Sequence, residues 1–159
     1  MGFLTGKTAI ITGAGRAILK DGSCGSIGYG IATAYAKEGA NLVITGRNVK
    51  KLEAAKQELE SLYGIKVLTV QADVCAGGDN EATVANVVKQ AVDTFGGIQV
   101  LINNAQASAS GVPLAEHTTE QFDLAIYSGL YAAFYYMKAC YPYLAESHGS
   151  VINFASGDR

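Results

Sequence analysis

Glycines gather where a short apolar run near the start of the chain gives way to a helical pattern. The run Thr8–Thr12 is rich in β-branched residues, as a buried strand requires, and Ile31–Glu38 is typical of a helix. A strand that passes through glycines into a helix aims backbone N–H groups and the helix dipole at one point, where phosphate binds well. A Cβ would block that approach. The glycines are Gly13, Gly15, Gly25, Gly28 and Gly30.

This glycine turn has a second interpretation. The strict dinucleotide-binding spacing is not met, because Ile18 stands where a third glycine is expected. A glycine-rich turn that binds no ligand therefore remains open. A mononucleotide P-loop is disfavoured, since no Gly-Lys-Ser/Thr sequence closes the turn.

The elements that would position this turn alternate between strand and helix along the whole chain. Such alternation predicts an α/β fold with a doubly wound parallel sheet of the Rossmann type, covered on both faces by right-handed crossovers. We expect a single dinucleotide-binding domain over residues 1–159. The expected strands are Thr8–Thr12, Asn41–Thr45, Lys66–Gln71, Val100–Asn103 and Ser150–Ala155, and the other expected helices are Val49–Tyr63, Glu81–Phe95 and Thr119–Leu144.

Polar residues follow the predicted strands, at the ends where parallel sheets bind their ligands. Because the carboxyl ends of parallel strands meet at one edge of the sheet, we expect these residues to lie close together. Their clustering favours a nucleotide site over a bare turn. They are Thr12-Gly13, Thr45-Gly46-Arg47, Asp73, Asn103-Asn104 and Ser156.

The composition is that of a globular protein, with 49% hydrophobic and 16% charged residues. A net charge of −2 and the lack of a basic run argue against nucleic acid or an anionic membrane as partner. No apolar stretch is long enough to cross a membrane, and the first residues do not read as a signal peptide. The widely spaced Cys24, Cys75 and Cys140 have no metal-ligand pattern, so we expect reduced thiols, no metal and a cytoplasmic location.

Jointly, the motifs resemble those of the short-chain dehydrogenase/reductases, in the family's order and over nearly the whole chain. The longer strings SIGYGIATAYAKEGANLVITGRN and NNAQASASGVPL are similar to bacterial bile-acid 12α-hydroxysteroid dehydrogenases. The motifs are Thr12-Gly13 with Gly15 and Gly28, Asp73-Val74, Asn103-Asn104-Ala105 and Asn153-Phe154-Ala155-Ser156.

The resemblance implies hydride transfer between a nicotinamide cofactor and a secondary alcohol or ketone. It implies that Ser156 orients the substrate oxygen and that Asp73 contacts the adenine ring; a helix cap and a turn residue are the alternatives for these two. It also implies that Asn103 and Asn104 tie neighbouring strands together. The expected cofactor-binding residues are Gly13, Gly15, Arg16, Ser26, Ile27, Gly28, Arg47, Asp73, Val74, Asn104 and Ala105.

The end of the second predicted strand favours NADP over NAD. An acid usually holds the ribose 2′-hydroxyl of NAD at this place, whereas this chain has Thr45-Gly46-Arg47. Arg47 can pair with the 2′-phosphate of NADP, and Arg16 could assist. The alternative is that Arg47 is a solvated surface residue.

Three departures from the family pattern stand out within the chain. Ala17–Gly25 lengthens the glycine turn, with Ser26 where a glycine is usual, and we expect an exposed excursion over the cofactor diphosphate. Gln106 replaces the glycine that normally ends the Asn-Asn-Ala motif. Gly129 stands where the family has an asparagine thought to hold a proton-relay water. Another group or a backbone carbonyl therefore holds that water here, or the relay is rearranged. Gln106–Val112 is expected to line the substrate pocket, a plain connecting loop being the alternative.

The family's catalytic Tyr-x-x-x-Lys does not occur among these residues. The chain looks like the N-terminal two-thirds of the enzyme, with five of the family's usual seven strands. We therefore expect residues 1–159 alone to be inactive and the full-length enzyme to act on a hydroxysteroid or a similar small apolar molecule, as a homo-oligomer. The aromatic residues of the long helix favour a subunit interface over a steroid-stacking surface. They are Tyr127, Tyr131, Phe134 and Tyr135.

Two other functions remain open. One is a non-catalytic protein that binds a dinucleotide, which the missing tyrosine and Gly129 would favour. The other is a reductase of the same fold with a different substrate, because Ser26-Ile27 before Gly-Tyr-Gly resembles the glycine turn of enoyl reductases. The Asn-Asn-Ala motif argues against the second.

Overall fold

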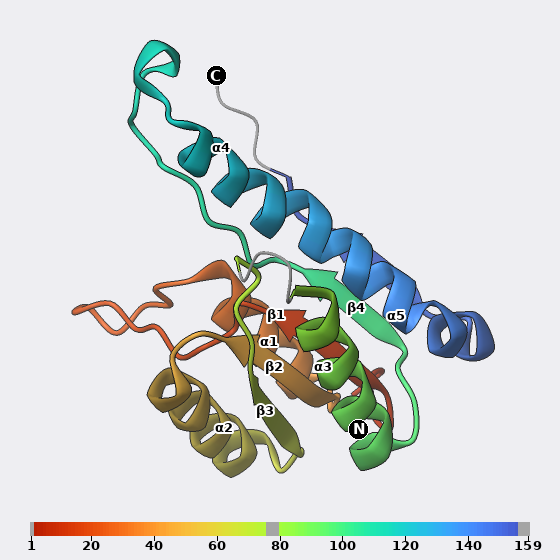
Figure 1. Cartoon of the computed structure of the whole chain (residues 1–159). Coiled ribbons are helices and arrows are strands. Elements are labelled where there is room, and N and C mark those ends of the chain that lie inside the picture. Colours follow the sequence, from red (N-terminus) through yellow and green to blue (C-terminus); the bar gives the residue numbers. More distant parts are fainter. Residues whose placement is uncertain (1, 76–79, 156–159) are drawn as a thin grey trace.

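A five-stranded parallel sheet forms the centre of the molecule, with strand order β3-β2-β1-β4-β5 (Figure 1). The computed structural model describes residues 2–75 and 80–155. The strands are β1 (Thr8–Thr12), β2 (Asn41–Gly46), β3 (Val67–Gln71), β4 (Val100–Asn103) and β5 (Ser150–Asn153). The helices are α1 (Ile27–Lys37), α2 (Val49–Tyr63), α3 (Asn80–Phe95), α4 (Thr119–Ile126) and α5 (Ala132–Ser147), with a 3-10 turn at Leu114–Glu116 and a π-helical turn at Tyr127–Tyr131.

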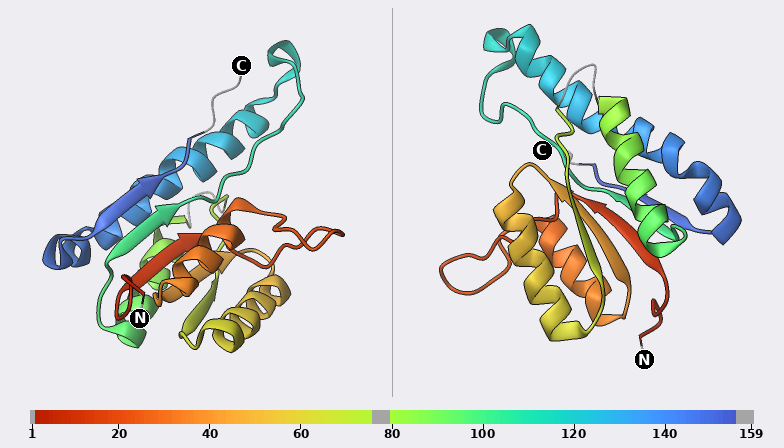
Figure 2. Two further views of the ribbon diagram at one scale, coloured as in Figure 1. Left: turned by 180° about the vertical axis from the view of Figure 1, so that it is seen from behind. Right: turned by 60° about the horizontal axis from the view of Figure 1, so that its bottom comes forward.

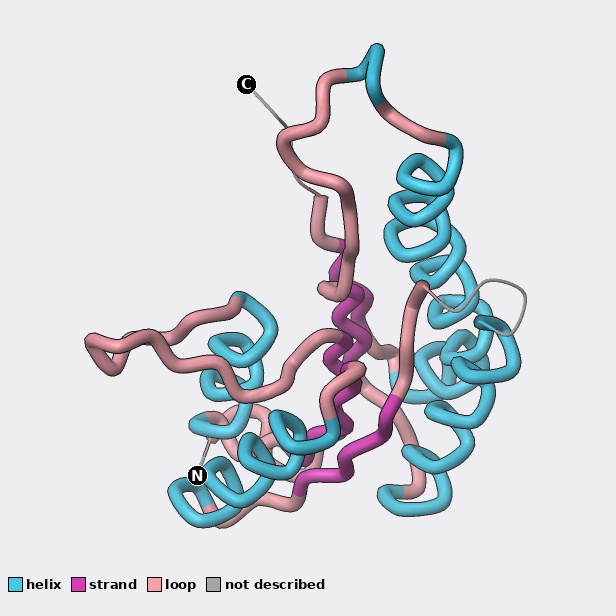
Figure 3. Tube along the Cα trace, turned by 60° about the vertical axis from the view of Figure 1, so that its left-hand side comes forward, coloured by secondary structure: helices cyan, strands magenta, loops and turns pink. Residues whose placement is uncertain are grey.

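Helices cover the sheet on two faces, which gives three layers (Figures 2 and 3). Successive strand residues point to opposite faces, so each strand contributes to two cores. Ile10 and Leu101 pack with α3 and α5, whereas Ile11 and Ile102 pack with α1 and α2. The apolar strands β1, β2 and β4 are buried on both faces, as in a parallel sheet covered by helices, whereas the edge strand β5 is exposed. The predicted Rossmann-type fold is confirmed.

The first helix begins earlier than its periodicity predicts. It starts at Ile27 and not at Ile31, because Ser26 caps it by accepting a hydrogen bond from the Tyr29 N–H at 3.4 Å. Gly28 and Gly30 therefore lie inside the helix. Gly28 must be a glycine because there is no room for a Cβ at that position. Since glycine disfavours helix, the sequence pattern did not predict that the helix includes it.

The long aromatic helix is also interrupted. Instead of one helix over Thr119–Leu144, α4 and α5 are joined by the π-helical turn, and α5 extends to Ser147. Such π-turns occur often at functional sites.

The excursion Ala17–Gly25 is an exposed hairpin that projects from the body of the molecule, as predicted (Figures 1 and 3). An antiparallel bridge joins Ile18 to Cys24, and the Gly25 N–H donates to the Ala17 carbonyl at 2.7 Å. The two ends of the hairpin therefore meet. Its place over a cofactor diphosphate stays a prediction.

Candidate cofactor and active site

The switch point of the sheet lies between β1 and β4, where the strand order reverses. Two cavities adjoin at the carboxyl ends of the strands there. One, of about 370 Å³, lies towards β5 and the α4–α5 junction, and the other, of about 220 Å³, lies towards β2 and β3. Val74, Asn104, Ala105 and Gln106 line both of them. The two cavities therefore form one cleft along the edge of the sheet.

The glycine turn is packed against the start of α1 without room for side chains. A Cβ on Gly28 would lie 2.2 Å from the Gly13 carbonyl oxygen and 2.6 Å from the Asn104 Nδ2. Gly13 itself has a φ of 71°, and a Cβ there would lie 3.1 Å from Ala105. Both glycines are thus required by close approach, and the turn brings α1 directly to the cleft.

Thr12 fixes the loop after β4 to the end of β1. Its Oγ1 accepts hydrogen bonds from the backbone N–H groups of Asn104 and Ala105 at 3.0 and 2.9 Å. The Asn104 Nδ2 donates to the Thr12 carbonyl at 2.9 Å. On the other side, the Asn103 Nδ2 donates to the Asn153 Oδ1 at 2.8 Å. The expected ties between neighbouring strands are confirmed, β1 to β4 and β4 to β5.

A third cavity, of about 240 Å³, lies between the glycine turn, the Ser26 cap of α1 and the end of β2. Arg47 and Lys51 line it, and no ion pair engages either side chain in the part of the chain that the structure describes. The first-turn N–H groups of a helix have no partners within the helix. Glycine backbone, a helix N-terminus and two uncompensated cations together fit an anionic group such as the phosphates of a dinucleotide.

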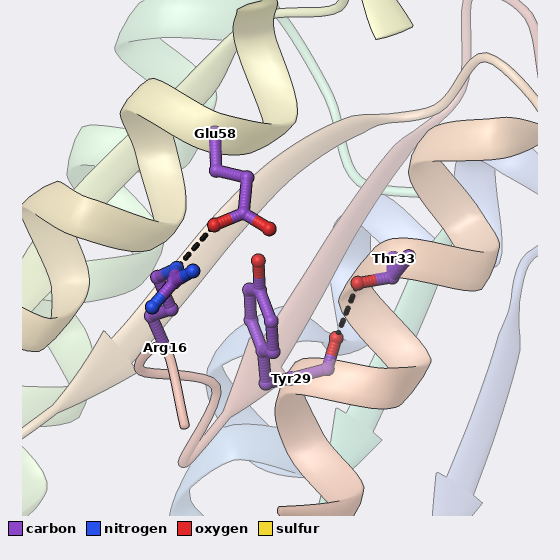
Figure 4. Close-up of polar contacts among 4 residues, drawn as sticks. All are labelled: Arg16, Tyr29, Thr33 and Glu58. Atoms are coloured by element: carbon purple, nitrogen blue, oxygen red, sulfur yellow. Dashed lines mark hydrogen bonds and ion pairs between the residues drawn. The ribbon is translucent and has the colours of Figure 1, made fainter. Parts of the chain in front are cut away.

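Arg16 lies elsewhere than Arg47, in a polar cluster with Glu58 and Tyr29 (Figure 4). Its Nε pairs with the Glu58 carboxylate on α2, and its backbone N–H donates to the Lys51 carbonyl at 2.8 Å. The hydrogen bond from Arg16 holds the pKa of Glu58 below its ordinary value. Burial, with the Glu58 carboxylate nearby, raises the pKa of Tyr29 to about 12. The cluster joins the glycine turn to α2, so a role of Arg16 towards a phosphate stays a prediction.

Asp73 follows β3 and forms a turn. Its Oδ1 accepts a hydrogen bond from the Cys75 N–H at 2.9 Å, which is the turn role left open by the sequence. Val74, the next residue, lines both cavities of the cleft. The predicted contact of Asp73 with adenine is untested.

Ser128 is a site residue that the sequence did not suggest. It lies in the π-helical turn, is 1% exposed, and its Oγ accepts a hydrogen bond from the Ala107 N–H at 2.9 Å. The same hydroxyl has the Ala107 and Leu124 carbonyls within donating distance, at 2.9 and 2.7 Å. It therefore fixes the loop after β4 against the long helix. A small polar residue inside an aromatic helix was the available signal.

Ser156, the expected catalytic serine, lies outside the described residues. The residues before it, Asn153, Phe154 and Ala155, line the larger cavity. Of the predicted cofactor-binding residues, the structure brings Gly13, Gly15, Ser26 and Arg47 to the third cavity and Val74, Asn104 and Ala105 to the cleft.

Comparison with known proteins agrees with this architecture. A family model described as short chain dehydrogenase matches residues 7–158. The chain belongs to the short-chain dehydrogenase family. It is 62% identical over 157 residues to a 12alpha-hydroxysteroid dehydrogenase of Clostridium sp., and the match covers 99% of this chain and 58% of that relative. The family resemblance inferred from the motifs is thereby confirmed.

Solved structures of the family superpose closely. L-sorbose reductase from Gluconobacter frateurii, in complex with NADPH and L-sorbose, matches with a TM-score of 0.82 and 30% identity over 96% of this chain and 53% of that one. An NAD⁺-bound xylitol dehydrogenase matches with a TM-score of 0.82 and 26% identity over 97% of this chain and 54% of that one. The chain thus spans between half and three fifths of the length of these relatives.

Two features are absent from residues 2–75 and 80–155. No helix there is long and apolar enough to cross a membrane. No group of three or more His, Cys, Asp or Glu side chains there is placed to hold a metal ion. The cysteines Cys24, Cys75 and Cys140 are free thiols, as expected.

Proposed function

We propose that this chain is the cofactor-binding part of an NADP-dependent oxidoreductase that interconverts a secondary hydroxyl group and a ketone on a hydroxysteroid or bile acid. The observation that carries the proposal is the cavity lined by glycines, the Ser26 cap and Arg47, whose lining fits an anionic group. The substrate class is supported by the 62% identity to a 12alpha-hydroxysteroid dehydrogenase. The proposal includes one dinucleotide-binding domain over residues 1–159, a cytoplasmic location and a homo-oligomer.

The cofactor preference follows from Arg47. NAD-binding sites place an acid at the end of the second strand, and here that position carries a cation with no ion-pair partner among the described residues. A guanidinium forms bidentate, charge-assisted hydrogen bonds with phosphate. Arg47 would therefore hold the 2′-phosphate of NADP, and Gly13, Gly15 and the first turn of α1 would hold the diphosphate.

The proposed reaction needs both a hydride path and a proton path. In the oxidative direction the alcohol C–H hydrogen leaves with its electron pair as a hydride, the hydroxyl proton leaves to solvent, and a ketone remains. A bound nicotinamide supplies the hydride acceptor. The chain's part is to orient the reactants, with Ser156 proposed to hydrogen-bond the substrate oxygen and the loop after β4 to form the wall of the cleft.

The test uses the complete protein with a panel of bile acids and both nicotinamide cofactors. We expect turnover that prefers NADP(H), and Arg47→Asp should weaken NADP(H) binding by on the order of a hundredfold, because each charge-assisted hydrogen bond contributes about 1.5–3 kcal/mol. Lys50→Asp is the matched control, with the same charge change on an exposed residue outside the cavity lining. Equal affinity for NAD and NADP, or an equal loss in both variants, would refute the assignment. Cofactor binding without turnover of any alcohol or ketone would favour the non-catalytic alternative.

A further inference from the structure

Three cationic residues belong to the segments around the third cavity, but only two of them line it. Arg47 and Lys51 do, whereas Arg16 does not. Among the described residues that form the lining, none carries a carboxylate. A phosphate monoester such as the 2′-phosphate of NADP has a charge of about −1.5 to −2 near neutral pH, so two unpaired cations match it.

The backbone of Lys51 is fixed against the glycine turn. Its carbonyl accepts the Arg16 N–H at 2.8 Å, and its own N–H donates to the Asn48 Oδ1 at 3.1 Å. A Cβ on Gly15 would lie 3.1 Å from the Lys51 Cβ. The Lys51 side chain therefore leaves α2 directly beside the glycine turn, and its ammonium group has no ion-pair partner among the described residues.

Arg16 starts from the same turn, but its guanidinium group is engaged between α1 and α2. Its Nε pairs with the Glu58 carboxylate, and the Tyr29 hydroxyl points toward the same carboxylate (Figure 4). The side chains of Arg16 and Glu58 are 39% and 31% exposed, and Tyr29 is buried. If Arg16 turned to a phosphate, it would leave the half-buried Glu58 carboxylate without its partner, which is unfavourable.

The ion pair also reduces the electrostatic effect of Arg16 on the third cavity. Because the Glu58 carboxylate is in contact with the guanidinium group, the two opposite charges largely cancel at a distance. The cavity is therefore left with the charges of Arg47 and Lys51. A neutral amide in place of Glu58 would leave the charge of Arg16 uncompensated and add a third positive charge.

We propose that Lys51 is the second cation of the 2′-phosphate site, and that Glu58 limits the discrimination between NADP and NAD by keeping Arg16 out of that site. The inference rests on the proposed NADP-dependent function. Lys51 contacts the 2′-phosphate together with Arg47, whereas Glu58 acts through Arg16 and is a positioning residue. The ratio of the affinities for NADPH and NADH therefore depends on Lys51, and Arg16 contributes to it only once Glu58 is neutralised.

The experiment measures the dissociation constants of NADPH and NADH for the complete protein by fluorescence titration, so it requires no turnover. We expect Lys51→Met to lower the ratio of NADPH to NADH affinity by about 10-fold, because a charge-assisted hydrogen bond to the 2′-phosphate is lost. Adenosine 2′,5′-bisphosphate, which carries the 2′-phosphate without the nicotinamide, should lose affinity by the same factor. Lys50→Met is the matched control, because it removes the same charge from a neighbouring exposed residue outside the cavity lining, and it should change the ratio by less than about twofold.

A second pair of variants tests the role of Glu58. Glu58→Gln should raise the NADPH/NADH affinity ratio by roughly 3- to 10-fold, since the charge of Arg16 is then uncompensated. The double variant Arg16→Gln with Glu58→Gln removes both charges of the pair, so its ratio should return to within about twofold of that of the unsubstituted protein. Loss of packing alone would not raise the ratio in one variant and restore it in the other.

Four results would overturn the inference. An unchanged ratio in Lys51→Met would make Lys51 a solvated surface residue, and an equal fall in Lys50→Met would reduce the effect to overall charge. A ratio that does not rise in Glu58→Gln would remove the role of Glu58. A ratio about tenfold lower in the double variant would make Arg16 a ligand of the 2′-phosphate.

The proposed function survives each of these results, because the unsubstituted protein would still bind NADPH in preference to NADH. Its own failure has a different signature. If the unsubstituted protein binds neither cofactor, the proposed function is refuted, and the inference about Lys51 and Glu58 is refuted with it.

Discussion

Gly28→Ala is the substitution whose effect follows most directly from the structure. The new Cβ would lie 2.2 Å from the Gly13 carbonyl oxygen, 2.6 Å from the Asn104 Nδ2 and 2.9 Å from the Gly13 carbonyl carbon. Two of these atoms are backbone, and the Asn104 amide is held by the Thr12 carbonyl, so α1 itself must move. Overpacking of this kind costs about 1–3 kcal/mol, and losing the Asn104 hydrogen bond adds about 1 kcal/mol. The expected loss of stability is therefore about 2–4 kcal/mol.

Gly30→Ala is the matched control, in the same helix. Its Cβ would meet only the Cys24 Sγ, at 3.4 Å, and alanine in a helix interior is favoured over glycine by about 0.5–1 kcal/mol. We expect Tm to fall by roughly 4–16 °C in Gly28→Ala and to stay level or rise in Gly30→Ala. Gly28→Ala should also weaken cofactor binding at least tenfold, measured by fluorescence titration, since the turn and the helix start move apart. Equal Tm values for the two variants would refute the close-packing argument.

Three smaller predictions concern the contacts around the cleft. Glu58→Gln should lower Tm by about 1–3 °C near neutral pH, because the ion pair with Arg16 is lost. The pKa of Glu58 is lowered in the folded state, so this difference in Tm should vanish as the pH falls through that lowered value. A difference that persists at low pH would argue against the ion pair. Deleting Ile18–Cys24 should leave the circular dichroism spectrum unchanged and alter cofactor affinity only modestly, since the ends of the hairpin already meet; an unfolded product would make the hairpin part of the core. Ser128→Ala should cost about 1–2 kcal/mol in urea denaturation by leaving the half-buried Ala107 N–H without its partner, whereas the exposed Ser61→Ala should cost under about 0.5 kcal/mol.

The fold was predictable because the strand patterns, the helix cap and the turn glycines of the sequence all indicate the same elements. The strands over Thr8–Thr12 and Val100–Asn103 and the helix over Val49–Tyr63 have the predicted bounds, since local β-branched runs, a helix cap at Asn48 and the αL glycine Gly64 mark them. The start of α1 was missed where local and tertiary preferences conflict. Glycine disfavours helix locally, but Gly28 lies in one because contact with Gly13 requires it there.

The site was predictable in its composition more than in its contacts. The motif residues do gather at the carboxyl ends of the strands, since the topology of a parallel sheet brings those ends together. The partners of individual side chains depend on long-range packing that no spacing encodes. Arg16 pairs with Glu58 on α2, and Ser128 binds the backbone of Ala107 from within an aromatic helix. Neither pair is readable from one sequence.

The contacts around the cleft fix the main chain and leave the side chain at Gln106 free to vary. Three sets of side-chain contacts hold the backbone around the cleft. Thr12 holds the loop after β4 to β1, Ser128 holds it to the helix, and Arg16 with Glu58 holds the glycine turn to α2. Because these contacts fix the main chain, a change of side chain at Gln106 can alter the chemistry of the wall without moving the wall.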